Sequence, residues 1–234
     1  MVFTRYYVSE DLPFNRGEAM RYFGMGARGA EPGPELGALF SECAQEAMAA
    51  CVYRVCFAEF GISRAQDGSL DLSFTRTDSR ALANNLRDCT RTVAFAATVG
   101  IGIDRLIARA SAVSQARAYA FQAIGAERIE ALCDRFSADV AAEYAEKGFS
   151  ARPRFSCGYG DFPIEKQRDF FLALDCQRKI GVALSDSLLM TPSKSVTAVI
   201  GLRPGRTGEK GDSGKGDRCS RCGAAGCGYR HTGA

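Results

Sequence analysis

The chain of 234 residues predicts an α+β fold in which an antiparallel or mixed β-sheet is flanked by helices. Helical and strand-like segments do not alternate regularly, as they do in folds with a parallel sheet. An Asp-Gly turn at residues 67–68 joins two strand-like runs, which is typical of a hairpin. Apolar residues make up 46% of the chain, enough to fill a sizeable core at this length.

Composition excludes several classes of protein. A net charge of +3, spread evenly along the chain, argues against binding to nucleic acid or to a membrane surface. No stretch approaches the ~20 apolar residues that a membrane-spanning helix needs, and no apolar run follows the first residues. We therefore expect a soluble, cytoplasmic protein.

Cysteine and histidine usage restricts the chemistry of the main domain. Seven of the ten cysteines are scattered through predicted helices and strands, so we expect them to be reduced and mostly buried. The single histidine, His231, lies close to the end of the chain. A Ser-His or Cys-His pair or a histidine-based metal site is therefore excluded from the main domain.

The first half of the chain predicts both helices and strands. Apolar positions recur at helical spacing in the Ala-rich stretch 35–50, and Thr77-Asp78-Ser79 predicts the cap of a helix that runs to Cys89. Residues 92–99 form a nearly unbroken apolar run, which indicates a buried strand. The predicted helices are 18–23, 35–50 and 77–89, and the predicted strands are 51–62, 70–74 and 92–99.

In the second half, two helices at 101–112 and 116–147 precede a glycine-rich loop. The longer helix contains Gly125, where we expect a break. After the loop, apolar residues at helical spacing predict a helix at 165–176, and β-branched residues predict a strand at 193–202.

The loop at 154–161 places a guanidinium, a hydroxyl, two glycines and an aromatic ring within eight residues. Glycine lets a backbone approach a ligand closely, Arg can bind a carboxylate through two parallel hydrogen bonds, and Tyr offers a ring face to a cation. These properties indicate a site for a polar ligand. The alternative is a tight turn in which Arg154 is merely solvated.

Several further motifs accompany this loop in order. Arg154, Gly158 and Tyr159 are followed by Glu165-Lys166 and by the stretches 180–187 and 190–196. With these motifs, residues 17–202 resemble the S-adenosylmethionine-binding activation domain of cobalamin-dependent methionine synthase. The Ser-Cys-Gly-Tyr-Gly-Asp sequence at 156–161 is most similar to the stand-alone version of that domain, which has proline where this chain has Cys157.

The resemblance implies that the chain binds S-adenosylmethionine. It implies that Arg154 binds the carboxylate of this ligand and that Asp139 binds its ammonium group. Glu143, one helical turn further on the same face, is the alternative acidic residue. For both acidic residues, a solvated helix face without a ligand is the other interpretation.

The resemblance also assigns roles within the loop and a reaction. Ser156 and Gly158 would offer backbone groups to the ligand, and Tyr159 would pack near its sulfonium or adenosine. In the family, S-adenosylmethionine supplies the methyl group that restores methylcobalamin from cob(II)alamin, with one electron from a donor. This reductive methylation requires in-line positioning but no proton shuttle.

The chain does not contain the Asp-x-His-x-x-Gly motif with which the family binds cobalamin, nor room for the homocysteine and folate barrels. We therefore expect a reactivation subunit for methionine biosynthesis whose cobalamin is carried by a separate partner. That partner would be a methionine synthase lacking its own activation domain, or a related corrinoid protein. An electron donor is expected as a second partner.

Composition changes after residue 202. Residues 203–218 are rich in Gly, Lys and Asp and predict a flexible linker between the domain at 1–202 and a Cys-rich tail at 219–234. The candidate metal ligands of the tail are Cys219, Cys222, Cys227 and His231. They suit zinc as a Cys3His set, or an iron-sulfur cluster if an outside ligand joins the thiolates. The alternative for the tail is that it binds no metal. The alternative for the function of the whole chain is a metal-binding adaptor of a corrinoid protein system without a catalytic role.

Overall fold

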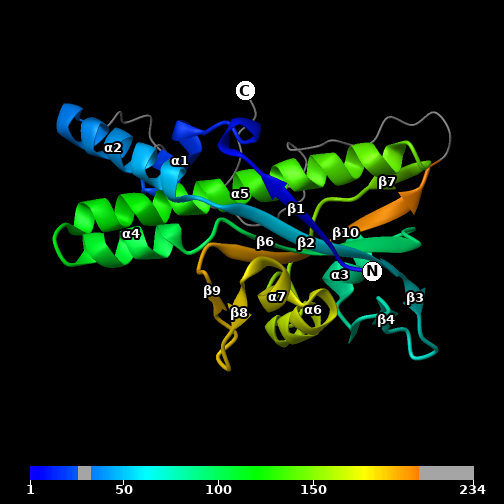
Figure 1. Ribbon diagram of the computed structural model, residues 1–234. Coiled ribbons are helices and arrows are strands. Elements are labelled where there is room, and N and C mark those ends of the chain that lie inside the picture. The colour runs from blue at the N-terminus through cyan, green and yellow to red at the C-terminus, as the bar shows by residue number, and fades with distance from the viewer. Residues whose placement is uncertain (26–32, 206–234) are drawn as a thin grey trace.

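A computed structural model describes residues 1–25 and 33–205. Its centre is a five-stranded, fully antiparallel sheet in which β2, β6 and β10 lie between two edge strands. The strands, in spatial order, are β1 (Phe3–Tyr7), β2 (Tyr53–Gly61), β6 (Arg91–Thr98), β10 (Ser195–Pro204) and β7 (Phe149–Ala151). Helices cover both faces (Figure 1), so the predicted α+β class is confirmed.

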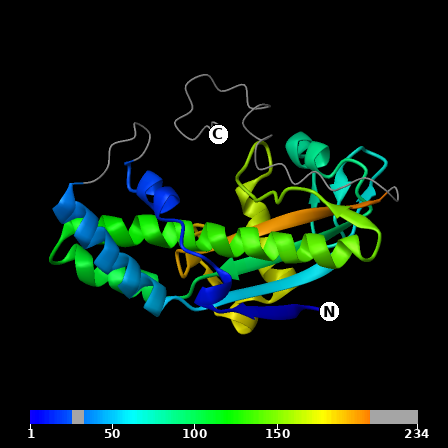
Figure 2. The same ribbon diagram turned by 90° about the horizontal axis from the view of Figure 1, so that it is seen from above.

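One face of the sheet carries the long helix α5, which runs roughly along the strands (Figure 2). Three further helices pack against α5 near one end of the molecule. These four helices are α1 (Arg16–Tyr22), α2 (Pro34–Ala50), α4 (Gly102–Ser111) and α5 (Gln115–Ala145). Local sequence explains their starts, because the side chains of Asn15 and Ser114 cap α1 and α5, and Pro34 opens α2.

The opposite face is covered by short elements. These are α3 (Arg80–Asn85), η2 (Ile164–Lys166), α6 (Gln167–Leu174) and α7 (Cys176–Ile180). Two small sheets and one further turn complete the described residues: η1 (Ser9–Asp11), β3 (Ser63–Arg64), β4 (Leu70–Asp71), β5 (Arg76–Thr77), β8 (Ala183–Leu184) and β9 (Met190–Thr191).

The core has two parts, one on each face of the sheet. Strand β6 shows why its sequence is apolar throughout: Val93, Phe95 and Ala97 face the α5 side, whereas Ala94 and Ala96 face the α6 side. Five of the scattered cysteines are buried and two are half-buried, and all seven are free thiols, as expected.

The structure corrects three predictions about elements. The turn at 65–69 forms, but it joins only β3 and β4, while the long strand β2 pairs with β1 and β6. Strands β1 and β7 lie where no strand was predicted. Helix α5 is not broken at Gly125, because the missing side chain makes room for Ile103 and Lys194, whose atoms would lie 2.8 and 3.0 Å from a Cβ there.

The predicted helix 165–176 is divided into η2, α6 and α7, with Asp175 in the left-handed conformation between α6 and α7. Strand β10 runs to Pro204, two residues beyond the predicted end of the domain, because residues 202–204 pair with β7.

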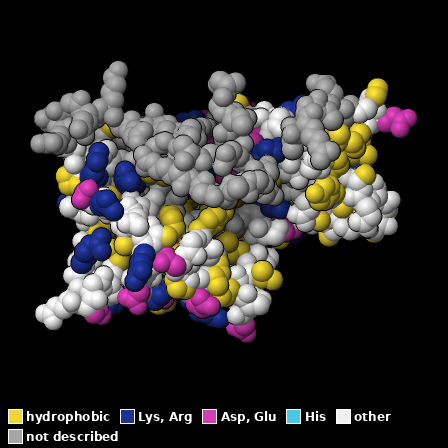
Figure 3. Space-filling model, turned by 180° about the vertical axis from the view of Figure 1, so that it is seen from behind, with side chains coloured by type: hydrophobic (Ala, Val, Ile, Leu, Met, Phe, Trp, Pro, Cys, Tyr) yellow, Lys and Arg dark blue, Asp and Glu magenta, His cyan; other side chains and the backbone are white. Residues whose placement is uncertain are grey.

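None of the helices described is both long and apolar enough to cross a membrane. On the face seen in Figure 3, Lys and Arg side chains gather toward the end of the molecule that carries α3 and β7.

Phe136 joins α5 to the sheet and provides a test of this packing. Its ring is fully buried and lies 5.1 Å from the ring of Phe57 and 4.9 Å from that of Phe95. Phe136→Ala should lower the free energy of unfolding by about 3–5 kcal/mol, because it removes apolar contacts and leaves a cavity. Urea denaturation would measure the loss. Leu172→Ala, at an 87% exposed position, should change it by less than ~0.5 kcal/mol, and equal effects of the two variants would contradict this packing.

Candidate functional site

The loop that follows β7 is attached to strand β10 by its backbone. The amide of Arg152 donates to the carbonyl of Gly201 (2.8 Å), and Phe155 and Val199 exchange two hydrogen bonds of 2.9 Å. Phe155 packs against the core on the α6 side of the sheet. Because neighbouring side chains of an extended segment point to opposite sides, Arg154 points the other way, toward α5.

Arg154 is held between two carboxylates on α5. Its Nη1 donates to Asp134 and its Nη2 to Glu130, which lie one helical turn apart on the same face. The guanidinium side chain is 13% exposed, whereas each carboxylate side chain is 42% exposed. The cluster therefore combines a largely buried cation with two anions that solvent or a ligand can reach.

The electrostatics of this cluster keep Arg154 charged. Burial alone lowers the pKa of its guanidinium, but the neighbouring Cys133 and the two carboxylates reverse this effect, so the net shift is upward. The phenol of Tyr22, on α1, is also close: burial raises its pKa, and the negative charge of Glu130 raises it further. Helix α1 therefore lies close to α5 at Glu130.

The rest of the loop forms a turn that exposes Gly158 and Tyr159. The amide of Gly158 donates to the carbonyl of Phe162 (2.8 Å), and φ at Gly158 is +84°. A side chain is unfavourable at this φ and would lie 3.2 Å from Ile164. Tyr159 is 67% exposed. Ser156 is half-buried, and its carbonyl accepts from the amide of Tyr159.

Cys157 is buried in this turn. Burial raises the pKa of its thiol to about 12, so the group is neutral at physiological pH and serves as a small apolar side chain.

Asp139 and Glu143 lie in a different environment from Arg154. Asp139 accepts from the hydroxyl of Tyr7 (2.7 Å) and from Nε of Arg135 (2.9 Å), and Glu143 binds Arg5. Asp139 follows Asp134 by five residues, which turns it about 140° around the helix. The described contacts of Arg154 are thus with Glu130 and Asp134 and those of Asp139 with other residues. The assignment of Asp139 to a ligand ammonium stays a prediction.

Sequence reasoning did not assign Glu130 and Asp134 to the site. Their spacing of four residues on a predicted helix places two acids on one face, which is the available sequence pattern. That pattern cannot show which cation the acids face. Arg154 follows Asp134 by 20 residues and Glu130 by 24 residues, so the contact depends on the tertiary structure.

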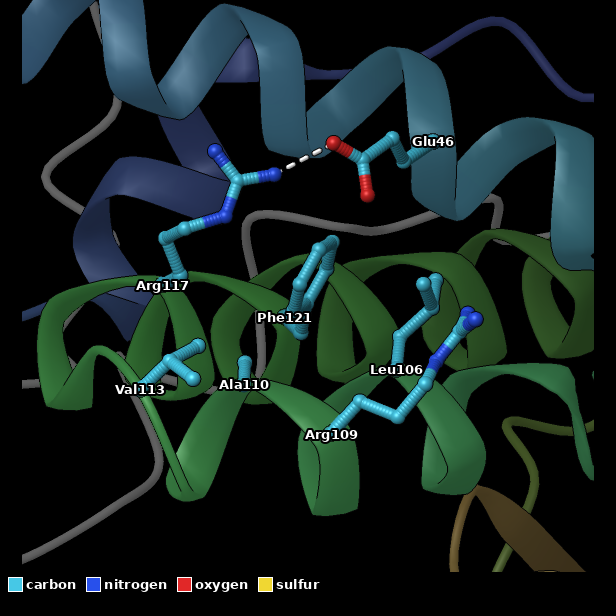
Figure 4. A pocket seen from close by; sticks show the side chains of 7 residues that line it. All are labelled: Glu46, Leu106, Arg109, Ala110, Val113, Arg117 and Phe121. Carbon is cyan, nitrogen blue, oxygen red and sulfur yellow. Dashed lines mark hydrogen bonds and ion pairs between the residues drawn. The ribbon is translucent and has the colours of Figure 1, made fainter.

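A pocket of about 190 Å³ lies elsewhere, between α2, α4 and α5 (Figure 4). Leu106, Ala110 and Phe121 contribute its apolar lining, and Arg117 closes one side through an ion pair with Glu46. None of its lining residues belongs to the 154–161 loop, so this pocket is separate from the Arg154 cluster.

No group of three or more potential metal ligands occurs within residues 1–25 and 33–205. The predicted ligands Cys219, Cys222, Cys227 and His231 lie outside the described residues.

The donors at Arg154 fit the amino-acid end of S-adenosylmethionine. A guanidinium matches its carboxylate in charge and geometry, and two carboxylates match its ammonium group in charge. Exposed Tyr159 and the glycine backbone lie in the same short loop.

Neither a protein-family model nor a curated protein sequence matches the chain. Among solved structures, the chain is similar to one described as the MetH reactivation domain bound to AdoHcy. The TM-score is 0.63 at 17% sequence identity, and the match covers 87% of this chain and 79% of that one. At this identity the similarity establishes a shared fold, as the sequence motifs predicted.

The position of Arg154 can be tested by its energetic coupling to the two candidate acids. In double-mutant cycles, Arg154→Met and Asp134→Asn should show a coupling of about 1 kcal/mol in unfolding free energy, since the pair is partly exposed to solvent. Arg154→Met and Asp139→Asn should show a coupling of about zero, because these residues have different partners. Urea unfolding of the single and double variants measures both values. Equal coupling in the two cycles would contradict the arrangement.

Proposed function

We propose that the chain binds S-adenosylmethionine at Arg154 and acts in the reductive reactivation of a cobalamin-dependent methionine synthase. The observation that carries the proposal is the Arg154 cluster: a largely buried guanidinium between Glu130 and Asp134, in the segment that leads into the Gly158–Tyr159 turn. The similarity in fold to a reactivation domain with AdoHcy supports it, because AdoHcy is the demethylated form of the same ligand.

The cluster favours a ligand that carries both charges of an amino acid. A ligand carboxylate can take the place of one protein carboxylate on Arg154, and the freed carboxylate can then bind the ligand's ammonium group. Such an exchange leaves every charged group of the cluster and of the ligand with a partner. A simple anion would free a protein carboxylate without giving it a new partner.

In this proposal Glu130 and Asp134 bind the ammonium group, because they face Arg154 and Asp139 does not. The backbone of Ser156 and Gly158 contacts the remainder of the ligand. Tyr159, whose ring is exposed, packs on the sulfonium or adenosine.

Bound S-adenosylmethionine supplies a methyl group, which is transferred to reduced cobalamin and leaves AdoHcy behind. The residues of this chain hold the amino-acid end and orient the sulfonium, and no residue is needed to move a proton. Cobalamin comes from a separate methionine synthase or related corrinoid protein, and an electron donor reduces it.

Ligand binding can be tested by anaerobic calorimetric titration with S-adenosylmethionine and with AdoHcy. The wild-type protein should bind both saturably, and Arg154→Ala should weaken binding by roughly 30-fold or more, because it removes a charged partner of the carboxylate. Decarboxylated S-adenosylmethionine has no carboxylate, so the same substitution should not weaken its binding further.

Arg117→Ala is the matched control for this titration. Arg117 also pairs with two carboxylates, Glu42 and Glu46, but it lies in the separate pocket. This variant should bind both ligands as the wild type does. The proposal is wrong if the wild type binds neither ligand in the presence of a cobalamin-carrying methionine synthase without its activation domain.

We also propose that the Cys-rich tail binds a metal through Cys219, Cys222, Cys227 and His231, a set typical of zinc or, for the thiolates, of an iron-sulfur cluster. Elemental analysis and the visible absorption of anaerobically purified protein distinguish the two. The wild type should contain about one zinc per chain, or iron together with the visible absorption of an iron-sulfur cluster. The double variant Cys219→Ser/Cys222→Ser should lose this metal. Removal of the tail should leave binding to S-adenosylmethionine unchanged. If the protein is instead an adaptor without a ligand, removal of the tail should abolish binding to the partner.

A further inference from the structure

The loop that carries Gly158 and Tyr159 is attached to α3 by one carboxylate. Asp161 accepts from the backbone amides of Arg80 (2.8 Å) and Ala81 (3.0 Å) and from the hydroxyl of Ser79. Among the described residues, Asp161 is the one member of the 156–161 segment whose side chain forms a hydrogen bond to another element.

The backbone of the loop also lies against the first turn of α3. At Gly160, where φ is +56°, a Cβ would lie 2.8 Å from the Cβ of Ala81, so a larger residue would push the loop off the helix. Ser79 is itself well held, because its Oγ accepts from the amide of Leu82 (3.0 Å) and its amide donates to Thr77 (3.2 Å). The loop is thus attached to a firm support.

Apart from those of Asp161, the hydrogen bonds that the described residues make to the loop all lie within residues 156–162. Gly158 and Gly160 both have positive φ and little conformational restriction of their own in the unbound chain, and Tyr159 is exposed. Holding such a segment in one conformation before a ligand arrives lowers the entropy that binding would otherwise cost.

We propose that Asp161 is a positioning residue that holds the 156–161 loop in its ligand-binding conformation through α3. This inference rests on the proposed function, because the ligand is the one proposed for Arg154. Asp161 does not contact the ligand. It fixes the direction of the Gly158 backbone and of the Tyr159 ring relative to Arg154, which is attached separately to α5. Loop and cation are therefore held by two different helices, and both attachments are needed for a preorganised site.

The carboxylate suits this role at physiological pH. The hydrogen bonds from Ser79, Ala81 and Arg80 lower its pKa below the ordinary value for aspartate, so it is ionised and accepts at both oxygens. Asparagine in its place would accept at one oxygen and present an NH2 group to an amide that needs an acceptor.

The experiment compares Asp161→Asn and Asp161→Ala with wild type in two measurements. Calorimetric titration with AdoHcy should give a Kd raised about tenfold in Asp161→Ala and less in Asp161→Asn, in line with the loss of a capping carboxylate. In amide NMR spectra without ligand, the Gly158 and Gly160 signals should shift and broaden, more in Asp161→Ala than in Asp161→Asn. Signals from the α5 residues Glu130 and Asp134 should stay in place.

Asp78→Asn is the matched control, since it removes an exposed carboxylate next to the same end of α3 without touching the loop. It should change neither the Kd nor the two glycine signals. Unchanged affinity and unchanged glycine signals in Asp161→Ala would overturn the inference. If the wild type binds neither AdoHcy nor S-adenosylmethionine beside a cobalamin-carrying methionine synthase, the proposed function fails. The glycine signals still decide whether Asp161 holds the loop.

Discussion

The packing of α5 on the sheet is the constraint on which the rest of the structure depends. Phe136 inserts between Phe57 and Phe95, and a row of buried residues along the same face continues this contact. Because these contacts fix the rotation of the helix about its axis, the directions of its other side chains are fixed too. Glu130 and Asp134 consequently meet the loop after β7, whereas Asp139 meets β1.

The same helix holds the N-terminal segment through a buried ion pair. Arg128 and Glu127 are almost fully buried, a costly arrangement unless both charges are well hydrogen-bonded. Here the guanidinium donates to both oxygens of Glu127 and to the carbonyls of Leu12 and Pro13, and Glu127 accepts from the amide of Asn15. These bonds connect β1 and α1 to α5, and α1 in turn contributes Tyr22 near Glu130.

Among the described residues, Arg5, Arg117 and Arg154 are each paired with two carboxylates one helical turn apart, but they differ in their surroundings. Arg117 lies between α5 and α2, within the helical layer. Arg154 comes from a loop with two glycines and an exposed aromatic ring, and its side chain is 13% exposed, against 27% for that of Arg117. The same pairing of an arginine with two carboxylates therefore occurs at Arg117 and at Arg154 in two different surroundings.

The fold class, the long helices, the buried strand β6 and the position of the glycine-rich loop could be predicted from the sequence, because they depend on local periodicity, caps and turn residues. The sequence did not reveal β1 or β7, whose short segments become strands by pairing with β2 and β10. Nor did it show that β2 pairs with β6 instead of its hairpin neighbour, or that Arg154 faces Glu130 and Asp134. These features were decided only in the tertiary structure, since each is a contact between distant segments whose direction is set by how α5 and the sheet pack together.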